Sequence, residues 1–581
     1  MFWPKKYFYE FGPFRLDATE RQLLRKGEVV PLGPKVFDVL LVLVQNSGHI
    51  LTKEQLMKLV WPNRTVEEGN LARNISTLRS ALGQQGREPR YIETIPWRGY
   101  RFVANVKEVY DRQRQPVIGS MAVLPFANVN ADAKTNYLAD GITESLISGL
   151  AQLTNLRVTS RNSAFRYKGR DVDAPTVGRE LKVQAIVMGR VAESEDMLSI
   201  SVELIDADDD RQLWGAQYIR SPTDLFAAQE IIAREIAERL RLELSRGETQ
   251  LVAKRHTQSH EAYLLFLKGR YYFHKLTLDG VRKGVEYFQE AIKKDPNYAL
   301  AYAWLGDCHN YMNQRDEARQ AVLKALELDE SLGEAHASLA FFRFLYDWDF
   351  AGAENEFRKA LALSPNYAEA HHWYGVYLAN LGRHDEAFKE AELAVALDPL
   401  SLLMNITAAL NFYTGRQYDH AVEQLHKVIE MDENFPAAHS VLGCVYVQKQ
   451  MFDEALAEYE KVMELVKGTP PVEASVQVLM AQAYARWGKK NEARRLLDQA
   501  AASSTSAYSV AGVYAALGEN DAAFEALNKA YEEHDIQLVS LKVDPTLDGL
   551  RDDLRFIDLE RRVGLPAGAR HSNAQASFNN A

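Results

Sequence analysis

A chain of 581 residues is too long for one hydrophobic core, so several domains are expected, and its 47% hydrophobic and 25% charged residues are typical of a globular, soluble protein. Cys308 and Cys444 are the only cysteines, which excludes a disulfide framework and a thiolate metal cluster. The longest apolar stretch near the start, residues 36–44, is far shorter than the ~20 residues of a membrane span, so we expect a cytoplasmic protein with no membrane partner.

Charge is divided unevenly along the chain. Residues 1–107 contain 17 Lys and Arg against 10 Asp and Glu, a net charge of +7, whereas the remaining residues contain 51 and 69, a net charge of −18. A small basic segment attached to a large acidic body indicates a polyanion as the partner of the basic segment. A solvated basic surface is the alternative.

The basic segment begins with strand patterns and continues with helical ones. Four short strands separated by turns predict a small antiparallel meander, at 7–11, 14–17, 22–25 and 29–31. A helix with apolar residues at helical spacing follows from Val36 and ends near Gly48. Thr52 and Gln55 have the spacing of a capping box for a second helix, and a third helix is expected over about 67–82.

The third helix has an apolar stripe on one face and side chains suited to DNA on the other. The side chains on this second face are small or form hydrogen bonds, and none is acidic: Asn70, Arg73, Asn74, Ser76, Thr77, Arg79 and Ser80. Arg and Asn can pair bidentately with guanine and adenine edges in the major groove, while short hydroxyl side chains let the backbone come close. The alternatives are a helix-surface cation for Arg79 and a cap or a solvated helix start for Asn70.

Residues 91–94 and 100–103 predict a hairpin whose tip is Pro96-Trp97-Arg98-Gly99. The order of meander, three helices and hairpin resembles the winged helix-turn-helix domain of OmpR/ToxR-type transcription regulators. The resemblance is carried by Leu-Arg-Ser-Ala-Leu at 78–82 and by Tyr-Ile-Glu-Thr-Ile-Pro-Trp-Arg-Gly-Tyr-Arg-Phe at 91–102. Two roles of Trp97 are equally compatible with the sequence: its ring packs against the wing, or it contacts a partner.

The resemblance assigns roles to individual residues. It implies that Asn70, Arg73, Asn74 and Thr77 face bases, that Ser76, Arg79 and Ser80 lie near phosphates, and that Arg98 enters the adjacent minor groove. It also implies that the loop Trp61–Thr65 occupies the place where such regulators can touch RNA polymerase. Because we expect neither a phosphoacceptor receiver before this domain nor a membrane helix after it, the signal should be cytosolic or come through a partner.

A polar linker is expected at 108–116, followed by a small α/β domain at 117–246 in which strand and helix patterns alternate. The runs 137–144, 161–169 and 204–207 resemble the TolB-like amino-terminal domain. Asp140, Glu144, Arg161 and Lys168 are ionisable, but no pair of them has the spacing of an active site or a metal site. We therefore expect no catalytic residue, no metal and no cofactor.

Residues 260–534 repeat with a period of 34 or 35 residues, marked by Asp295, Asp329, Ser364, Asp398 and Asp432. This period and the placement of small residues resemble tetratricopeptide repeats, and about eight are expected. The inner groove of such a solenoid suits an extended segment or a partner helix. Candidate partner contacts on that face, each of which could equally be idle, are Asn310, His372, Asn380, Tyr413 and Gln448. A capping segment at 535–565 and a disordered tail at 566–581 are expected to follow.

The predicted fold class is multidomain and mainly α, with an N-terminal winged helix-turn-helix domain at 1–107, a central small α/β domain and a C-terminal α-solenoid of tetratricopeptide repeats. The whole resembles the HilA-like regulators. It implies a one-component, sequence-specific transcription regulator that binds double-stranded DNA, is not an enzyme, and could form a homo-oligomer. Two alternatives are a scaffold whose winged helix docks protein, and a signalling enzyme, because TolB-like and repeat segments also accompany nucleotide cyclases.

Overall fold

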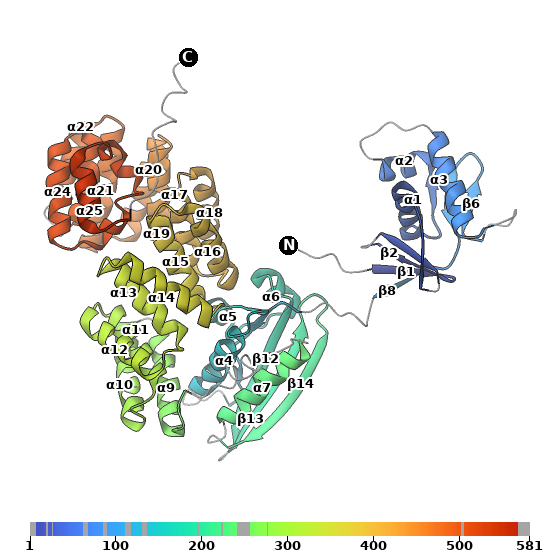
Figure 1. Ribbon diagram of the computed structural model, residues 1–581, viewed down its shortest axis with the longest axis horizontal. Coiled ribbons are helices and arrows are strands. Elements are labelled where there is room, and N and C mark those ends of the chain that lie inside the picture. Colours follow the sequence, from blue (N-terminus) through green and yellow to red (C-terminus); the bar gives the residue numbers. More distant parts are fainter. Residues whose placement is uncertain are drawn as a thin grey trace. The chain divides into compact units, whose positions relative to one another are not determined.

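The computed structural model divides the chain into two compact units, Met1–Pro116 and Val117–Ala581, and each is described by itself (Figure 1). The residues that the structure describes are 7–18, 21–25, 27–61, 68–84, 90–110, 118–130, 136–194, 197–221, 225–240, 256–275, 277–500 and 505–566. The predicted tail is outside this set except for Pro566, as is most of the predicted linker.

An antiparallel sheet forms one layer of the first unit, with strand order β4-β3-β2-β1-β8. Its strands are β1 (Tyr7–Phe11), β2 (Phe14–Asp17), β3 (Gln22–Arg25), β4 (Glu28–Val30) and β8 (Lys107–Tyr110). The first four confirm the predicted meander. Because β8 pairs with β1 from Lys107 to Tyr110, the sheet continues into residues that we had assigned to the linker.

Three helices pack over this layer: α1 (Pro34–Gln45), α2 (Lys53–Val60) and α3 (Glu68–Ala81). The predicted capping box is present, since the Thr52 hydroxyl accepts from the Gln55 amide and the Gln55 side chain accepts from the Thr52 amide. A second sheet, β5-β7-β6, contains β5 (Ile50–Thr52), β6 (Ile92–Ile95) and β7 (Gly99–Phe102). The hairpin β6–β7 was predicted, whereas β5, a strand of only three residues, was not.

A mixed sheet forms the base of the second unit, with main strand order β11-β9-β12-β13-β14. Its strands are β9 (Ser120–Val123), β10 (Ala127–Asn128), β11 (Arg157–Val158), β12 (Ala185–Ser194), β13 (Met197–Asp206) and β14 (Gln212–Arg220). The helices beside it are α4 (Asn136–Ala151), α5 (Arg161–Phe165), α6 (Ala174–Leu181) and α7 (Leu225–Arg239). Side chains alternate between the two faces of the sheet: Val187 packs with α4 and α7, whereas Ile186 packs with α6 on the other face.

Eight antiparallel helical pairs follow, as the period predicted. They are α9 (His260–Phe273) with α10 (Leu278–Lys294), α11 (Ala299–Tyr311) with α12 (Arg315–Leu328), α13 (Gly333–Leu345) with α14 (Phe350–Leu363), α15 (Ala368–Asn380) with α16 (His384–Leu397), α17 (Leu402–Thr414) with α18 (Tyr418–Met431), α19 (Pro436–Gln448) with α20 (Phe452–Leu465), α21 (Pro470–Arg486) with α22 (Lys490–Ala500), and α23 (Ala507–Leu517) with α24 (Asn520–Glu532). Small residues lie where the helices cross, because a Cβ added at Gly306 would be 2.8 Å from the Val322 side chain.

The last described residues form η2 (Ile536–Ser540), η3 (Pro545–Leu550) and α25 (Leu554–Val563). This segment does more than cover the final repeat. Leu538 and Phe556 share a hydrophobic cluster with Phe344 of α13 and Tyr377 of α15, and the Arg416 guanidinium donates to the Val543 carbonyl over 2.6 Å. The C-terminal segment therefore packs back onto the middle of the solenoid.

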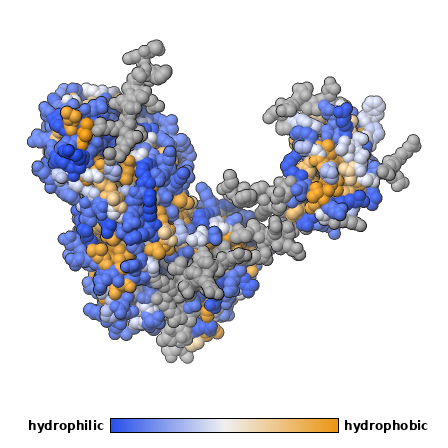
Figure 2. Space-filling view, in the orientation of Figure 1, coloured by the Kyte–Doolittle hydropathy of each residue, from blue (hydrophilic) through white to orange (hydrophobic). Residues whose placement is uncertain are grey.

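Central sheet and repeats share one hydrophobic core. Val187 in the sheet and Ile142 in α4 belong to the same cluster as Phe266, Phe288 and Leu305 of the first repeats. The residues assigned from sequence to two separate domains are thus one packed body. Length and hydropathy together rule out a membrane-spanning role for each helix in the described part of the chain. The surface of Figure 2 is mostly hydrophilic, with hydrophobic patches over the repeats.

Candidate nucleic-acid interface

The exposed face of α3 results from how the rest of the helix is buried. Leu71, Ile75 and Leu78 are almost completely buried in the core of the first unit, as the apolar stripe predicted. Because this stripe faces α1 and the sheets, the polar side of α3 points to solvent. Asn70, Arg73, Ser76, Thr77 and Ser80 are exposed, and Asn74 is half-buried.

Several polar side chains of this face are held by their own helix. Thr77 donates its hydroxyl proton to the Arg73 carbonyl over 3.0 Å, Ser80 donates to the Ser76 carbonyl over 3.2 Å, and the Asn74 amide donates to the Asn70 carbonyl over 2.7 Å. These bonds use donor protons and fix the rotamers. The oxygens of these side chains keep acceptor capacity toward an incoming group, while the Arg73 guanidinium supplies donors.

Arg79 lies elsewhere than the other polar residues of α3. It is half-buried, and its guanidinium donates to the Ile92 carbonyl over 3.1 Å and to the Thr94 hydroxyl over 2.7 Å. Both acceptors belong to β6, the first strand of the wing. Arg79 therefore joins the helix to the wing, an arrangement that differs from the phosphate contact expected from the sequence.

The wing tip presents Trp97 and Arg98 to solvent. Trp97 is fully exposed and has a left-handed backbone, with φ of +64°, so its ring does not pack the wing. Arg98 is also exposed. Gly99 is required next to them because an added Cβ would lie 2.0 Å from the Leu51 carbonyl oxygen of β5. The hairpin thus holds an aromatic ring and a cation at its turn.

The predicted polymerase-contact loop is described only at its first residue. Trp61 follows α2 and is half-buried, with the Lys35 ammonium 5.8 Å from the ring centroid. Residues 62–65 lie outside the described residues.

Three of the predicted contacts in the repeat groove need correction. His372, Asn380 and Tyr413 are buried and have partners within the chain: His372 hydrogen-bonds the Thr407 hydroxyl, the Asn380 amide donates to the Val376 carbonyl, and the Tyr413 hydroxyl accepts from the Gln448 amide. The C-terminal segment packs against α15 beside Asn380. His372 contacts Thr407 of the next repeat, and Tyr413 packs with Leu442 and Val445 of the repeat after it.

Asn310 and Gln448 remain partly accessible. The Gln448 side-chain oxygen accepts from Arg486 over 2.6 Å, and Asn310 lines the large cavity of the second unit. Both stay candidate contacts of a partner or ligand.

Histidines of the repeats have a structural role in this fold. His336, His371 and His439 each place Nδ1 2.6 Å from a glutamate oxygen of the following helix and Nε2 within 3.0 Å of a backbone carbonyl six residues earlier. Since a carbonyl only accepts, Nε2 must carry a proton in each case. The repeated geometry ties the two helices of three repeats together.

Family comparisons match three kinds of domain in this chain. Residues 27–102 match the family "Transcriptional regulatory protein, C terminal", and residues 118–233 match "HilA/YgeH-like transcriptional regulator, second domain". Residues 299–332, 356–389 and 436–465 match tetratricopeptide repeats. The central segment thus matches a HilA-like domain, and its TolB-like resemblance remains a prediction.

Among curated proteins, the transcriptional regulator HilA of Salmonella typhimurium is 23% identical over 508 residues, which cover 84% of this chain and 87% of that protein. Putative adenylate cyclase 3 of Rhizobium meliloti is 31% identical over 282 residues, which cover 47% of this chain and only 42% of that protein. Among solved structures, the DNA-binding domain of Escherichia coli CadC is 28% identical, with a TM-score of 0.17, over 18% of this chain and 98% of that one.

Proposed function

We propose that this chain, which joins an OmpR/PhoB-type winged helix-turn-helix domain, a HilA-like second domain and tetratricopeptide repeats, is a one-component transcription regulator that binds specific sequences of double-stranded DNA. The observation that carries the proposal is the exposed polar face of α3, which offers Arg73 and short amide and hydroxyl groups without an acidic side chain. The domain-by-domain similarity to transcription regulators supports it.

In this proposal α3 lies in the major groove. Asn70, Arg73, Asn74 and Thr77 face base edges, and Ser76 and Ser80 lie near phosphates. Arg98 at the wing tip enters the neighbouring minor groove. Arg79 holds the wing at the angle at which helix and tip can reach adjacent grooves, because it belongs to α3 and its guanidinium donates to Ile92 and Thr94 of β6.

Charge sets the strength expected of this interface. The basic segment of residues 1–107 has a net charge of +7, so phosphate neutralisation should supply much of the binding free energy and make it fall steeply with salt. One small module binds weakly, and two linked copies would bind far more tightly. A homo-oligomer on paired half-sites, in the cytoplasm, is therefore part of the proposal, as is RNA polymerase contact through Trp61–Thr65.

The repeats are proposed to receive a protein partner, with Gln448 and Asn310 as the remaining contacts. We assign no catalytic role to the chain. The relative named putative adenylate cyclase 3 is matched over less than half of its length, whereas the regulator HilA is matched over most of its length.

Genome-wide mapping of the DNA bound in cells tests the proposal and separates it from a protein-docking scaffold. A regulator should give a recurring operator sequence that is lost with Arg73→Ala and kept with Arg25→Ala, which removes an exposed cation from β3. A scaffold would give no operator, and its partners would be retained by both variants. Equal loss of bound DNA with both variants would mean that binding depends only on the overall positive charge of the first unit, and it would contradict a specific role of α3.

A further inference from the structure

The central sheet domain contacts repeats that lie well beyond the first repeat, which follows it in the sequence. The Asn366 amide donates to the carbonyls of Ala151, Leu153 and Leu156 over 2.9 to 3.0 Å. Asp398 is fully buried and accepts from the Ser163 hydroxyl over 2.5 Å. Because α4 also packs on α9 of the first repeat, the domain and the first four repeats enclose a space between them.

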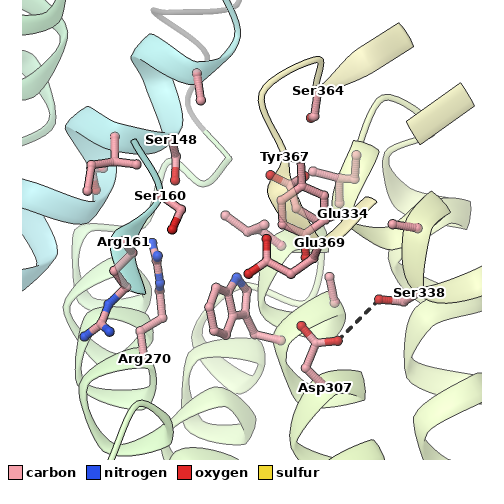
Figure 3. A pocket seen from close by; sticks show the side chains of 18 of the residues that line it. Ser148, Ser160, Arg161, Arg270, Asp307, Glu334, Ser338, Ser364, Tyr367 and Glu369 are labelled. Carbon is pink, nitrogen blue, oxygen red and sulfur yellow. Dashed lines mark hydrogen bonds between the residues drawn. The ribbon is translucent and has the colours of Figure 1, made fainter. Parts of the chain in front are cut away.

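That space is a cavity of about 630 Å³, in the size range of small-molecule sites. One wall comes from α4, α5 and α9, and the other from the first helices of successive repeats, α11, α13 and α15 (Figure 3). Aromatic side chains complete the lining: Phe273, Tyr298, Trp304, Phe341, Tyr367 and Trp373. The cavity therefore offers apolar surface for the body of a ligand and two chemically different walls for its ends.

The repeat wall is acidic. Asp307, Glu334 and Glu369 come from three consecutive repeats and face the cavity (Figure 3). Burial raises the pKa of the Asp307 carboxyl to about 7, despite a hydrogen bond from the Ser338 hydroxyl at 3.3 Å. Burial, with Asp398, Asp307 and Glu334 nearby, likewise raises the pKa of Glu369 to about 7. Within the described chain neither Asp307 nor Glu369 forms an ion pair.

The opposite wall is cationic. Arg161 and Arg270 both pair with Glu144, whose side chain is 1% exposed; the Arg270–Glu144 distance is 2.8 Å. Burial raises the pKa of Glu144, but Arg270 and Arg161 more than offset it and hold that pKa at about 2. Burial lowers the pKa of His274 to about 3, so that ring is neutral. Among the described residues, two guanidinium groups thus share the single carboxylate of Glu144, while Glu230 of α7 is a second acid that lines the cavity.

Polar atoms without partners also line the space. Gln229 is 7% exposed, its oxygen accepts from the Tyr263 hydroxyl over 2.8 Å, and its buried Nε2 has no hydrogen-bond partner among the described residues. The Ser160 hydroxyl and the Arg270 Nε are likewise buried without a partner in the described structure. A buried donor without an acceptor destabilises the structure, and an acceptor on a ligand would remove that cost.

We propose that this cavity binds a small zwitterion of short-peptide type, with its ammonium group at Asp307, Glu334 and Glu369 and its carboxylate at Arg270 and Ser160. The aromatic lining holds the body between the two ends, and the Gln229 amide supplies a further donor. Since the site joins the central domain to the repeats, it would be the signal input of the regulator; only that role rests on the proposed function, and the binding itself does not.

Equilibrium dialysis of the full chain against a mixed-sequence tripeptide library, read by mass spectrometry without DNA, tests the binding. Free tripeptides should be retained, whereas libraries blocked by N-acetylation or by C-amidation should each be retained at least tenfold less. Equal retention of the N-acetylated library would overturn the assignment of the acidic wall, and equal retention of the amidated library that of Arg270. Retention of none of the libraries would overturn the proposal, whether or not the chain binds DNA.

Variants locate the site. Glu369→Gln and Asp307→Asn keep side-chain shape and should lower tripeptide retention at least tenfold, while Glu327→Gln, on the outside of α12, should leave retention unchanged. Retention should rise as pH increases through about 7, because Glu369 and Asp307 must lose protons to hold an ammonium group. The other charged groups that act on them are Glu334 and Asp398. Retention that is equal in all three variants would refute the proposed site.

Discussion

Arg79 and Arg73 lie on the same helix, yet replacing them should have different effects. In Arg79→Ala the wing loses the hydrogen bonds to Ile92 and Thr94. A hydrogen bond to a charged group contributes about 1.5–3 kcal/mol, but the Ile92 carbonyl keeps a bond from Gln84 at 2.9 Å, and the exposed Thr94 hydroxyl can bond water. We therefore expect the wing to lose about 1–2 kcal/mol of local stability.

Hydrogen exchange of the full chain measures this loss. A change of about 1–2 kcal/mol corresponds to a factor of roughly 5–30 in the opening equilibrium, so amides of β6 and β7 should exchange faster by that factor in Arg79→Ala. Arg73→Ala should leave exchange in the wing unchanged, because Arg73 is exposed on the outer face of α3. Unchanged wing exchange in Arg79→Ala, together with weaker DNA binding, would refute this reasoning and favour a direct phosphate contact.

Three further outcomes follow from the packing and charges of the two units. Gly99→Ala should destabilise the first unit by about 3 kcal/mol in thermal unfolding, because the added Cβ would lie 2.0 Å from a backbone oxygen. Gly83→Ala is the control: Gly83 has a φ of +69° and open space around it, so this variant should cost only about 1–2 kcal/mol. Asn366→Ala should remove about 1–3 kcal/mol from the docking of the central domain and speed amide exchange around residues 151–157, and unchanged exchange there would argue against that docking. In the second unit, Asp307 and Glu369 bind protons more tightly in the folded than in the unfolded chain, so the free energy of unfolding should decline from about pH 4 to about pH 7 and level off above. Asp307→Asn and Glu369→Gln should each flatten this decline, which unfolding midpoints across that pH range would measure.

Local patterns predicted most elements of the fold. The capping box of Thr52 and Gln55, the apolar stripe of α3 and the repeat period are all encoded within a few neighbouring residues, and the structure confirms them. Strands β5 and β8 were missed because each has only three or four residues and is fixed by its partner strand rather than by its own pattern.

Contacts between distant segments could not be predicted from sequence spacing. No spacing in the sequence indicated a partner for Asp140 or Glu144, yet both are buried, and Glu144 pairs with arginines 17 and 126 residues away. The return of residues 536–563 onto α13 and α15 was equally invisible, and it is one reason why a predicted groove residue such as Asn380 is buried. Sequence reasoning predicted the exposed face of α3 because that face depends on helical periodicity alone.

The central claim, that α3 binds double-stranded DNA, is tested most directly by the salt dependence of binding of the full chain to a mapped operator, followed by fluorescence anisotropy. The logarithm of the affinity should fall linearly with the logarithm of salt concentration, with a slope of about −0.9 per phosphate contact. Arg73→Ala should lower affinity by about 1–3 kcal/mol, roughly 5- to 150-fold, at every salt concentration. Absence of binding to the duplex at low salt, or unchanged affinity in Arg73→Ala, would contradict the claim.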